Sequence, residues 1–187
     1  MKNIAVFASG EGTNAQSLID HFKLSEKGRV VVVVCSNPNA NVIKRAKNAN
    51  IPILLIDKIK FKETTELLEE LKKQKVDFIV LAGFLWLIPS YLTKAYPNRI
   101  VNIHPALLPK YGGKGMYGSN VHKAVVANKE KESGISIHYV NEHYDEGKLI
   151  LQAKCDLNEN DTAESLAEKI HKLEQEHYAR TIDKLLN

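Results

Sequence analysis

The sequence predicts a single-domain, Rossmann-like α/β fold with a mostly parallel, twisted sheet and helices on both of its faces. Two observations favour this class. Short apolar runs of strand type alternate with segments whose apolar residues recur at helical spacing. The run Val30–Cys35 is rich in valine and does not alternate, as in a parallel strand covered on both faces. A length of 187 residues suits one core and is marginal for two, so we expect one domain over residues 1–187.

The first half of the chain reads as alternating strands and helices. The strands expected up to residue 104 are Ile4–Ser9, Val30–Cys35, Ile53–Ile56, Val76–Leu81 and a fifth that ends at His104. A glycine-rich loop, Ser9–Asn14, follows the first strand and opens a helix that carries Ala15, Leu18, Ile19 and Phe22. Further helices are expected over Val42–Ala49 and Lys62–Lys73, and a short one from Pro89.

The pattern changes after Pro109. Residues Gly112–Gly118 predict a flexible loop, and Asn120–Asn128 has helical periodicity. Strands are expected over Gly134–Val140, where apolar and polar residues alternate, and over Leu149–Asp156. Thr162 is placed to cap a final helix over Ala163–Leu186.

The composition is that of an ordinary globular protein, with 44% hydrophobic and 26% charged residues. No apolar run approaches the roughly 20 residues of a membrane span, and the N-terminus lacks a secretory signal, so we expect a cytoplasmic protein. The net charge of +4 is mild and interleaved with acids, which predicts no nucleic-acid partner but would attract an anionic small molecule. Cys35 and Cys155 form no C-x-x-C pair and are interpreted as reduced thiols.

The glycine-rich loop indicates an anion site. Gly10-x-Gly12 between a strand and a helix places free backbone N–H groups at a helix N-terminus, and Asn14 could add a side-chain donor. The loop formally matches the dinucleotide fingerprint G-x-G-x-x-A, but no acid follows the second strand. A single phosphate therefore fits better than a dinucleotide, and a tight turn without a ligand is the alternative.

The strand that ends at His104 carries the strongest chemical signal. Asn102 and His104 are two residues apart and so share a face, just before two prolines end the strand. An amide can donate to a developing oxyanion, and an imidazole can exchange a proton near neutral pH. This pair suits attack on a carbonyl-like carbon. The alternative is a turn-capping asparagine beside a core histidine.

Asp145 is the third catalytic candidate. It lies close to Gly147 in the loop between the two late strands, which can approach the other strand ends. A carboxylate near His104 would raise the histidine pKa and could position a water for proton transfer. The alternative is an ordinary turn aspartate. None of the other histidines has a spacing that predicts a metal site.

Four segments, taken in this order, resemble the phosphoribosylglycinamide formyltransferases, also called glycinamide ribonucleotide transformylases. They are Ser9–Asn14, Leu81–Phe84, Asn102–Pro109, and Gly134–Val140 leading into Tyr144–Gly147. The resemblance covers nearly the whole chain. It implies the family's formyltransferase fold, with a phosphate-binding, Rossmann-like half over residues 1–100 and a catalytic and folate-binding half over residues 101–187.

The resemblance implies transfer of the formyl group of 10-formyl-tetrahydrofolate, a cosubstrate, to the primary amine of 5'-phosphoribosylglycinamide in de novo purine (IMP) biosynthesis. The family's catalytic residues fall on Asn102, His104 and Asp145. Its substrate contacts fall on Gly12, Thr13, Asn14, Gly83, Pro105 and Glu176. Its folate contacts fall on Lys62, Leu85, Trp86, Leu87, Ile88, Asn102 and His138. No metal is implied, and the protein would be a monomer or a homodimer.

The roles implied by the resemblance agree with the chemistry of the side chains. The amine attacks the formyl carbon directly, and Asn102 and protonated His104 stabilise the tetrahedral oxyanion. Asp145 keeps His104 charged and helps to transfer the proton through water. The sequence departs from the commonest family pattern at Trp86, which replaces an arginine found in many members, and at the end of the chain, where no segment follows the last helix. It also departs at the loop Tyr111–Tyr117, which is expected to cover the folate as a lid but is longer and richer in glycine than usual, so its closure stays open.

Three other functions are alternatives. Formyltetrahydrofolate deformylase shares the asparagine, histidine and aspartate but uses water as nucleophile, and methionyl-tRNA formyltransferase has a similar Asn-x-His-Pro segment. Both normally carry a second domain, for which we expect no room in 187 residues. A formyltransferase for another amine is also compatible. A non-enzymatic phosphate-binding module would keep the Gly10-x-Gly12 loop but would not need Asn102, His104 and Asp145 together.

Overall fold

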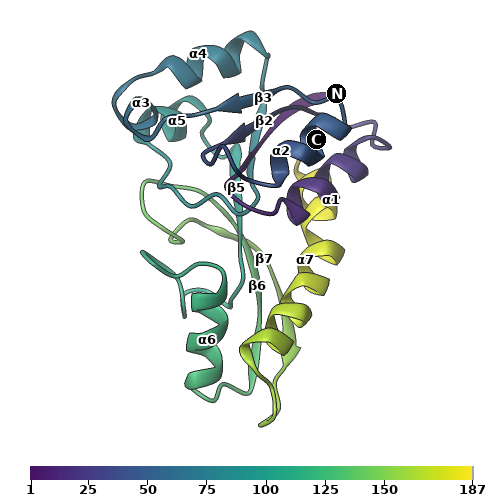
Figure 1. The fold of residues 1–187 in the computed structure, drawn as a ribbon, viewed down its shortest axis with the longest axis vertical. Helices are drawn as coiled ribbons and strands as arrows, with labels where there is room; N and C mark the ends of the chain where they lie inside the picture. The colour runs from purple at the N-terminus through teal and green to yellow at the C-terminus, as the bar shows by residue number, and fades with distance from the viewer. Residues whose placement is uncertain (187) are drawn as a thin grey trace.

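One open, twisted sheet runs through the computed structural model, which describes residues 1–186 (Figure 1). Within these residues the sheet has seven strands in the order β3-β2-β1-β4-β5-β6-β7. They are β1 (Lys2–Ala8), β2 (Gly28–Cys35), β3 (Ile53–Leu55), β4 (Phe78–Leu81), β5 (Ile100–His104), β6 (Glu132–Tyr139) and β7 (Leu149–Asp156). The first five are parallel, and β6 is antiparallel to both β5 and β7. The predicted class, an α/β fold with a mostly parallel sheet, is confirmed.

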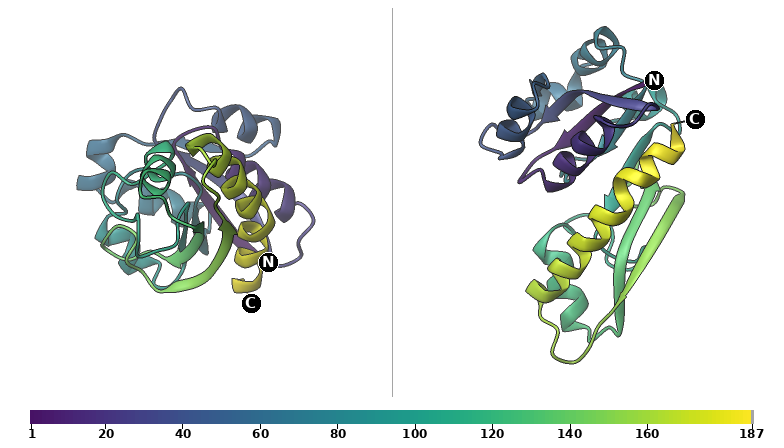
Figure 2. Two further views of the ribbon diagram at one scale, coloured as in Figure 1. Left: turned by 90° about the horizontal axis from the view of Figure 1, so that it is seen from below. Right: turned by 90° about the vertical axis from the view of Figure 1, so that its right-hand side faces the viewer.

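Helices cover both faces of this sheet, as expected. They are α1 (Thr13–Phe22), α2 (Val42–Asn48), α3 (Lys58–Glu63), α4 (Glu66–Lys73), α5 (Ser90–Ala95), α6 (Ser119–Ala127) and α7 (Ala163–Leu185). On β1, Ile4 and Val6 pack with buried residues of α1, α2, α6 and α7, whereas Ala5 and Phe7 pack with α3, α4 and α5. Figure 2 shows α7 lying along the sheet beside β6 and β7. The strand alternation thus places one apolar layer on each face.

The prediction of one helix over Lys62–Lys73 is wrong, because two short helices occupy this stretch. The chain becomes extended at Thr64, with φ −123° and ψ 164°, and separates α3 from α4. The side chain of Asp57 accepts hydrogen bonds from two N–H groups at the start of α3, a cap that fixes the helix four residues earlier than expected. This earlier start buries Phe61.

The remaining boundaries differ by a few residues at most. Strand β4 starts at Phe78 rather than Val76, because Lys75 has a positive φ of 53° and the chain turns there. Helix α7 begins after Thr162, which forms a capping box with Ser165. The sheet is continuous across residue 100, the expected boundary between the two halves of the domain. Residue 187, the last of the predicted domain, lies outside the described residues. Within residues 1–186, none of the helices is both long and apolar enough to cross a membrane.

Candidate active site

The carboxyl ends of β1, β4 and β5 lie at one edge of the sheet, and hydrogen bonds join the segments that follow them. Ser9, directly after β1, donates its N–H to the Gly83 carbonyl oxygen at 3.0 Å. The Ser9 Oγ accepts the N–H of Leu85 at 3.2 Å. Open parallel sheets bind ligands at this edge, and these contacts hold the glycine-rich loop beside the segment after β4.

Tyr178 of α7 is a buried residue that is hydrogen-bonded to both β4 and β5. Its buried hydroxyl donates to the carbonyl oxygens of Leu81 at 2.7 Å and Val101 at 3.3 Å. Burial raises the pKa of this phenol well above its ordinary value, so it remains a donor. The end of β4 and the strand that carries Asn102 and His104 therefore share one hydrogen-bond donor in the core.

Asn102 and His104 occupy β5 in the predicted arrangement. In the antiparallel register with β6, Asn102 pairs with His138 and His104 pairs with Ser136. Only 3% of His104 is exposed, whereas Asn102 is half-buried. Both side chains point to the same face, as their spacing requires.

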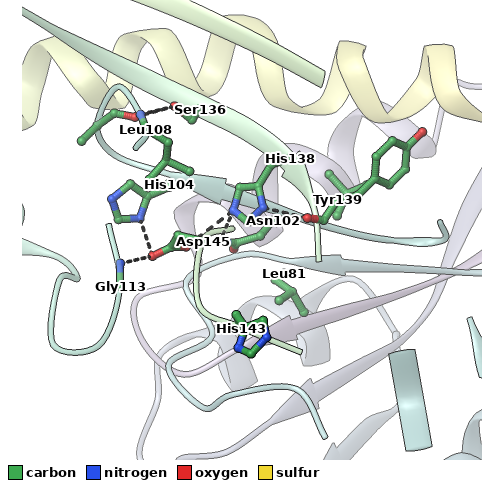
Figure 3. A network of polar contacts seen from close by, with 12 residues as sticks. Leu81, Asn102, His104, Leu108, Gly113, Ser136, His138, Tyr139, His143 and Asp145 are labelled. Carbon is green, nitrogen blue, oxygen red and sulfur yellow. Dashed lines mark hydrogen bonds and ion pairs between the residues drawn. The ribbon is translucent and has the colours of Figure 1, made fainter. Parts of the chain in front are cut away.

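The loop between β6 and β7 brings Asp145 to this pair (Figure 3). One carboxylate oxygen, Oδ2, lies 3.5 Å from His104 Nδ1 and accepts the N–H of Gly113 at 2.9 Å. The other, Oδ1, lies 3.5 Å from both Asn102 Nδ2 and His138 Nε2. The structure thus brings together the three residues that the sequence singled out as catalytic.

His138 belongs to this polar network, a position more central than the folate-pocket wall that we expected. Its Nε2 lies 3.2 Å from Asn102 Nδ2, and its Nδ1 lies 2.8 Å from the Tyr139 carbonyl oxygen. Since Nδ1 faces a carbonyl oxygen, it carries a proton. His138 thereby orients the Asn102 amide, a contact that depends on the register between two strands and could not be derived from the sequence.

Burial governs the charge state of the pair His104 and Asp145. Burial lowers the pKa of His104 below its ordinary value, although the Asp145 carboxylate and the Tyr111 carbonyl oxygen favour the charged imidazole. Our expectation of a raised pKa is therefore wrong for the net effect. Burial also opposes charge on Asp145, but His138, His104 and the Gly113 N–H together hold its pKa below the ordinary value. At neutral pH a carboxylate faces a largely neutral imidazole.

A cleft of about 590 Å³ surrounds these residues. Most of the predicted site residues line it: Asn14, Gly83, Leu85, Trp86, Leu87, Ile88, Asn102, His104, Pro105, His138 and Asp145. The expected lid is part of the wall, since residues 113–118 also line the cleft. The predicted residues Gly12, Thr13, Lys62 and Glu176 do not line it.

One end of the cleft is apolar and aromatic. Trp86 packs against Phe61 and Phe84, with ring centroids 5.6 and 5.9 Å apart. All four residues of the segment 85–88 line this part of the cleft. Lys62, expected beside a folate tail, is an exposed residue of α3 next to Phe61 and outside the cleft.

The other end is polar and includes Glu174 in place of the predicted Glu176. Glu174 lines the cleft, and its side chain is 15% exposed and lies 3.7 Å from His171 Nδ1. Glu176 points away, with 61% of its side chain exposed. Residues two apart on a helix face directions about 200° apart, so only one of them can face the cleft. Glu174 follows the buried Ile170 by four residues, a spacing that could have identified it.

Burial raises the pKa of Glu174, while a hydrogen bond with Asn14 and the nearby His171 act against this shift. The Oδ1 atom of Asn14 is buried without a hydrogen-bond partner among residues 1–186. A buried acceptor of this kind is costly unless a ligand donates to it. This end of the cleft is therefore suited to a ligand that carries hydroxyl or amine donors.

The glycine-rich loop continues from this polar end. Gly12 has φ 72° and precedes the first turn of α1, and a side chain there would collide with Val42. Thr13 lines a shallower hollow of about 350 Å³ beside Arg45, a cation that the sequence analysis did not single out. The N–H groups of the first helical turn and this cation favour an anion at the loop.

Fold and cleft define an α/β protein with hydrogen-bond donors and proton-transfer groups placed for chemistry at a carbonyl carbon. The sequence profile described as formyl transferase matches residues 2–182. The chain belongs to the formyl transferase family.

Named relatives agree with this assignment. A phosphoribosylglycinamide formyltransferase of Bacillus subtilis is 36% identical, with 100% of this chain and 95% of that protein covered. A chloroplastic one of Vigna unguiculata is 41% identical over 98% of this chain, which spans only 61% of that protein's length. Among solved structures, glycinamide ribonucleotide transformylase 1 of Geobacillus kaustophilus matches with a TM-score of 0.90, 37% identity and 100% coverage of both chains.

Proposed function

We propose that this chain transfers the formyl group of 10-formyl-tetrahydrofolate to the primary amine of phosphoribosylglycinamide, a step of de novo purine biosynthesis. The observation that carries the proposal is the position of Asn102, His104 and Asp145 in one cleft, between an apolar end and a polar end. The relatives named above are called phosphoribosylglycinamide formyltransferases or glycinamide ribonucleotide transformylases, which supports the choice of the formyl acceptor.

The polar end would bind the phosphoribosyl amine. Its phosphate would lie at the first turn of α1 beside Thr13 and Arg45, where backbone N–H groups favour an anion. Glu174 and the unpartnered Asn14 Oδ1 would accept hydrogen bonds from the hydroxyl groups of the pentose. In this proposal Glu174, and not Glu176, is the glutamate that contacts the substrate.

The apolar end would hold the folate. A cleft of about 590 Å³ falls in the usual range for sites of drug-sized ligands, and its aromatic wall offers Trp86 for stacking. Leu85, Leu87, Ile88 and Val140 line the same region. The bound cosubstrate would supply an activated formyl group, and the residues 113–118 would exclude water as they close over it.

The side chains then account for the chemistry. One N–H of Asn102 Nδ2 is directed to His138, and the other makes only a long contact of 3.5 Å with Asp145 Oδ1. This second N–H would turn to the oxygen that gains charge as the amine attacks. His104 is largely neutral before the reaction, so it can accept the proton that the amine loses and hold it beside the oxyanion. Asp145, 3.5 Å away, stabilises the resulting imidazolium. The proton finally moves to the leaving nitrogen.

The test is a turnover assay with both substrates, and with each omitted. We expect tetrahydrofolate to form only when phosphoribosylglycinamide is present. Turnover that does not depend on the amine would indicate a deformylase and contradict the proposal. No turnover with this amine would require a different acceptor or a phosphate-binding module without catalysis. We expect His104→Ala to lower turnover by about 10²-fold or more.

Several expectations stay predictions. They are a cytoplasmic location, a monomer or homodimer, a reaction without a metal, and a division of the domain near residue 100. The cleft draws its residues from both sides of that boundary, since Trp86 and Glu174 both line it.

A further inference from the structure

His104 lies between two hydrogen-bond acceptors. Its Nδ1 faces Asp145 Oδ2 at 3.5 Å, and its Nε2 lies 2.7 Å from the backbone carbonyl oxygen of Tyr111. A carbonyl oxygen only accepts, so Nε2 must carry a proton. The nitrogen that gains or loses a proton during the reaction is therefore Nδ1, on the side of Asp145.

The position of the Tyr111 carbonyl oxygen depends on a constrained turn. Tyr111 has φ 57°, a left-handed conformation that is unfavourable for a tyrosine. The next residue, Gly112, has no space for a side chain, because a Cβ atom there would lie 2.6 Å from Leu108 Cδ2 and 3.3 Å from Asp145 Cβ. Such a conformation persists only when surrounding contacts maintain it.

The side chain of Tyr111 provides such a contact. Its hydroxyl donates to Glu130 Oε1 at 2.8 Å, and Lys110 Nζ binds the same oxygen at 2.9 Å. Glu130 directly follows the turn that ends α6, and its own N–H donates to the Val125 carbonyl oxygen at 3.4 Å. Tyr111 is thus attached to a helix of the core at one end and to His104 at the other.

We propose that the hydrogen bond between Tyr111 and Glu130 is a positioning device that holds the Tyr111 carbonyl oxygen against His104 Nε2 and so keeps Nδ1 as the proton-exchanging nitrogen. Neither residue touches the reacting atoms. The consequence for the reaction rests on the proposed function, whereas the effect on the His104 ring does not. The other titratable groups that face His104 are Asp145, His138 from β6 and His122 from α6.

Tyr111→Phe tests this role because it removes only the hydroxyl. Nitrogen-15 NMR of the histidine rings, with His104→Gln to assign the signal, reports which nitrogen is protonated and how fast its proton exchanges. We expect a single tautomer protonated at Nε2 in the native protein. In the variant, we expect a tautomer mixture and Nε2 proton exchange about tenfold faster or more, because the acceptor is no longer fixed.

Turnover provides the second measurement. We expect Tyr111→Phe to lower kcat about tenfold while KM for the amine changes less than about twofold, since the change alters the orientation of His104 and no substrate contact. Glu130→Ala should reproduce both effects, and Glu130→Gln, which keeps an oxygen acceptor, should restore both. If Tyr111→Phe does not fold, the two Glu130 variants decide the question.

Tyr91→Phe is the matched control, because it removes a hydroxyl that donates to the Phe61 carbonyl oxygen at 3.1 Å, away from His104. It should leave the His104 signals and kcat unchanged. An unchanged His104 tautomer and exchange rate in Tyr111→Phe would overturn the proposal. A native protein without amine-dependent turnover would instead refute the proposed function, and the NMR comparison would still test the positioning role.

Discussion

Replacing Asp145 with asparagine would remove a charge from the centre of the site while preserving its shape. The carboxylate lies 3.5 Å from His104 Nδ1, and its side chain is 10% exposed. At an effective dielectric constant near 20, unit charges at this separation attract by about 5 kcal/mol. If the transition state uses about half of this energy, the loss of about 2.5 kcal/mol corresponds to about a 70-fold decrease in kcat.

The amide also disturbs the hydrogen bonds. Asp145 Oδ2 accepts from Gly113, and Oδ1 faces Asn102 Nδ2. An asparagine has one oxygen, so its NH₂ group must face one of these donors. Because the lost charge and the disturbed hydrogen bond act together, we expect Asp145→Asn to lower kcat by about 10²-fold or more.

The assay is steady-state kcat and KM for both substrates, with circular dichroism to verify the fold. Glu146→Gln, a charge change at the adjacent residue that does not line the cleft, is the control. Turnover of Asp145→Asn within about threefold of the native protein would refute the role assigned to this carboxylate.

Three further predictions concern other parts of the molecule. Glu174→Gln should raise KM for the phosphoribosyl amine about tenfold, whereas Glu176→Gln should leave it unchanged; equal effects would contradict the assignment of the cleft-facing glutamate. Tyr178→Phe should lower the free energy of unfolding by about 1–2 kcal/mol in urea titrations, because the carbonyl oxygens of Leu81 and Val101 lose a donor. The lowered pKa of His104 means that the unfolded chain binds a proton more readily, so the free energy of unfolding should fall as the pH drops below about 6.5. His104→Gln should remove part of this decrease, and an unchanged pH dependence would argue against a buried neutral imidazole.

Local patterns were sufficient for most of the fold. Valine-rich and alternating runs predicted the strands within a few residues, because side-chain burial on a sheet follows a period of two. The same reasoning failed at Thr64, which separates α3 from α4. The leucine spacing of α4 gives no sign that the helix cannot continue back to Lys62, whereas the cap at Asp57 and the extended backbone at Thr64 divide the stretch into two helices. Helix propensity is too weak to locate such a break.

The proximity of two candidate catalytic residues was also accessible from the sequence, because Asn102 and His104 share a strand and their common face follows from spacing alone. Their relation to Asp145 could only be a hypothesis, since Asp145 lies 41 positions after His104 in the sequence. In the structure, Asp145 lies 3.5 Å from both His104 Nδ1 and Asn102 Nδ2, in the network drawn in Figure 3.

The sequence by itself determined the α/β class, the approximate positions of the strands along the chain and the identity of the catalytic candidates. The tertiary structure decided how His138 pairs with Asn102, that Glu174 and not Glu176 faces the cleft, and that Tyr111 contacts His104. It also decided the direction of the His104 pKa shift, because burial outweighs the neighbouring carboxylate. The physical reason is that contacts between distant segments and the exclusion of water depend on packing in three dimensions, which local periodicity does not specify; only for Glu174 did the helical spacing from Ile170 offer a local signal.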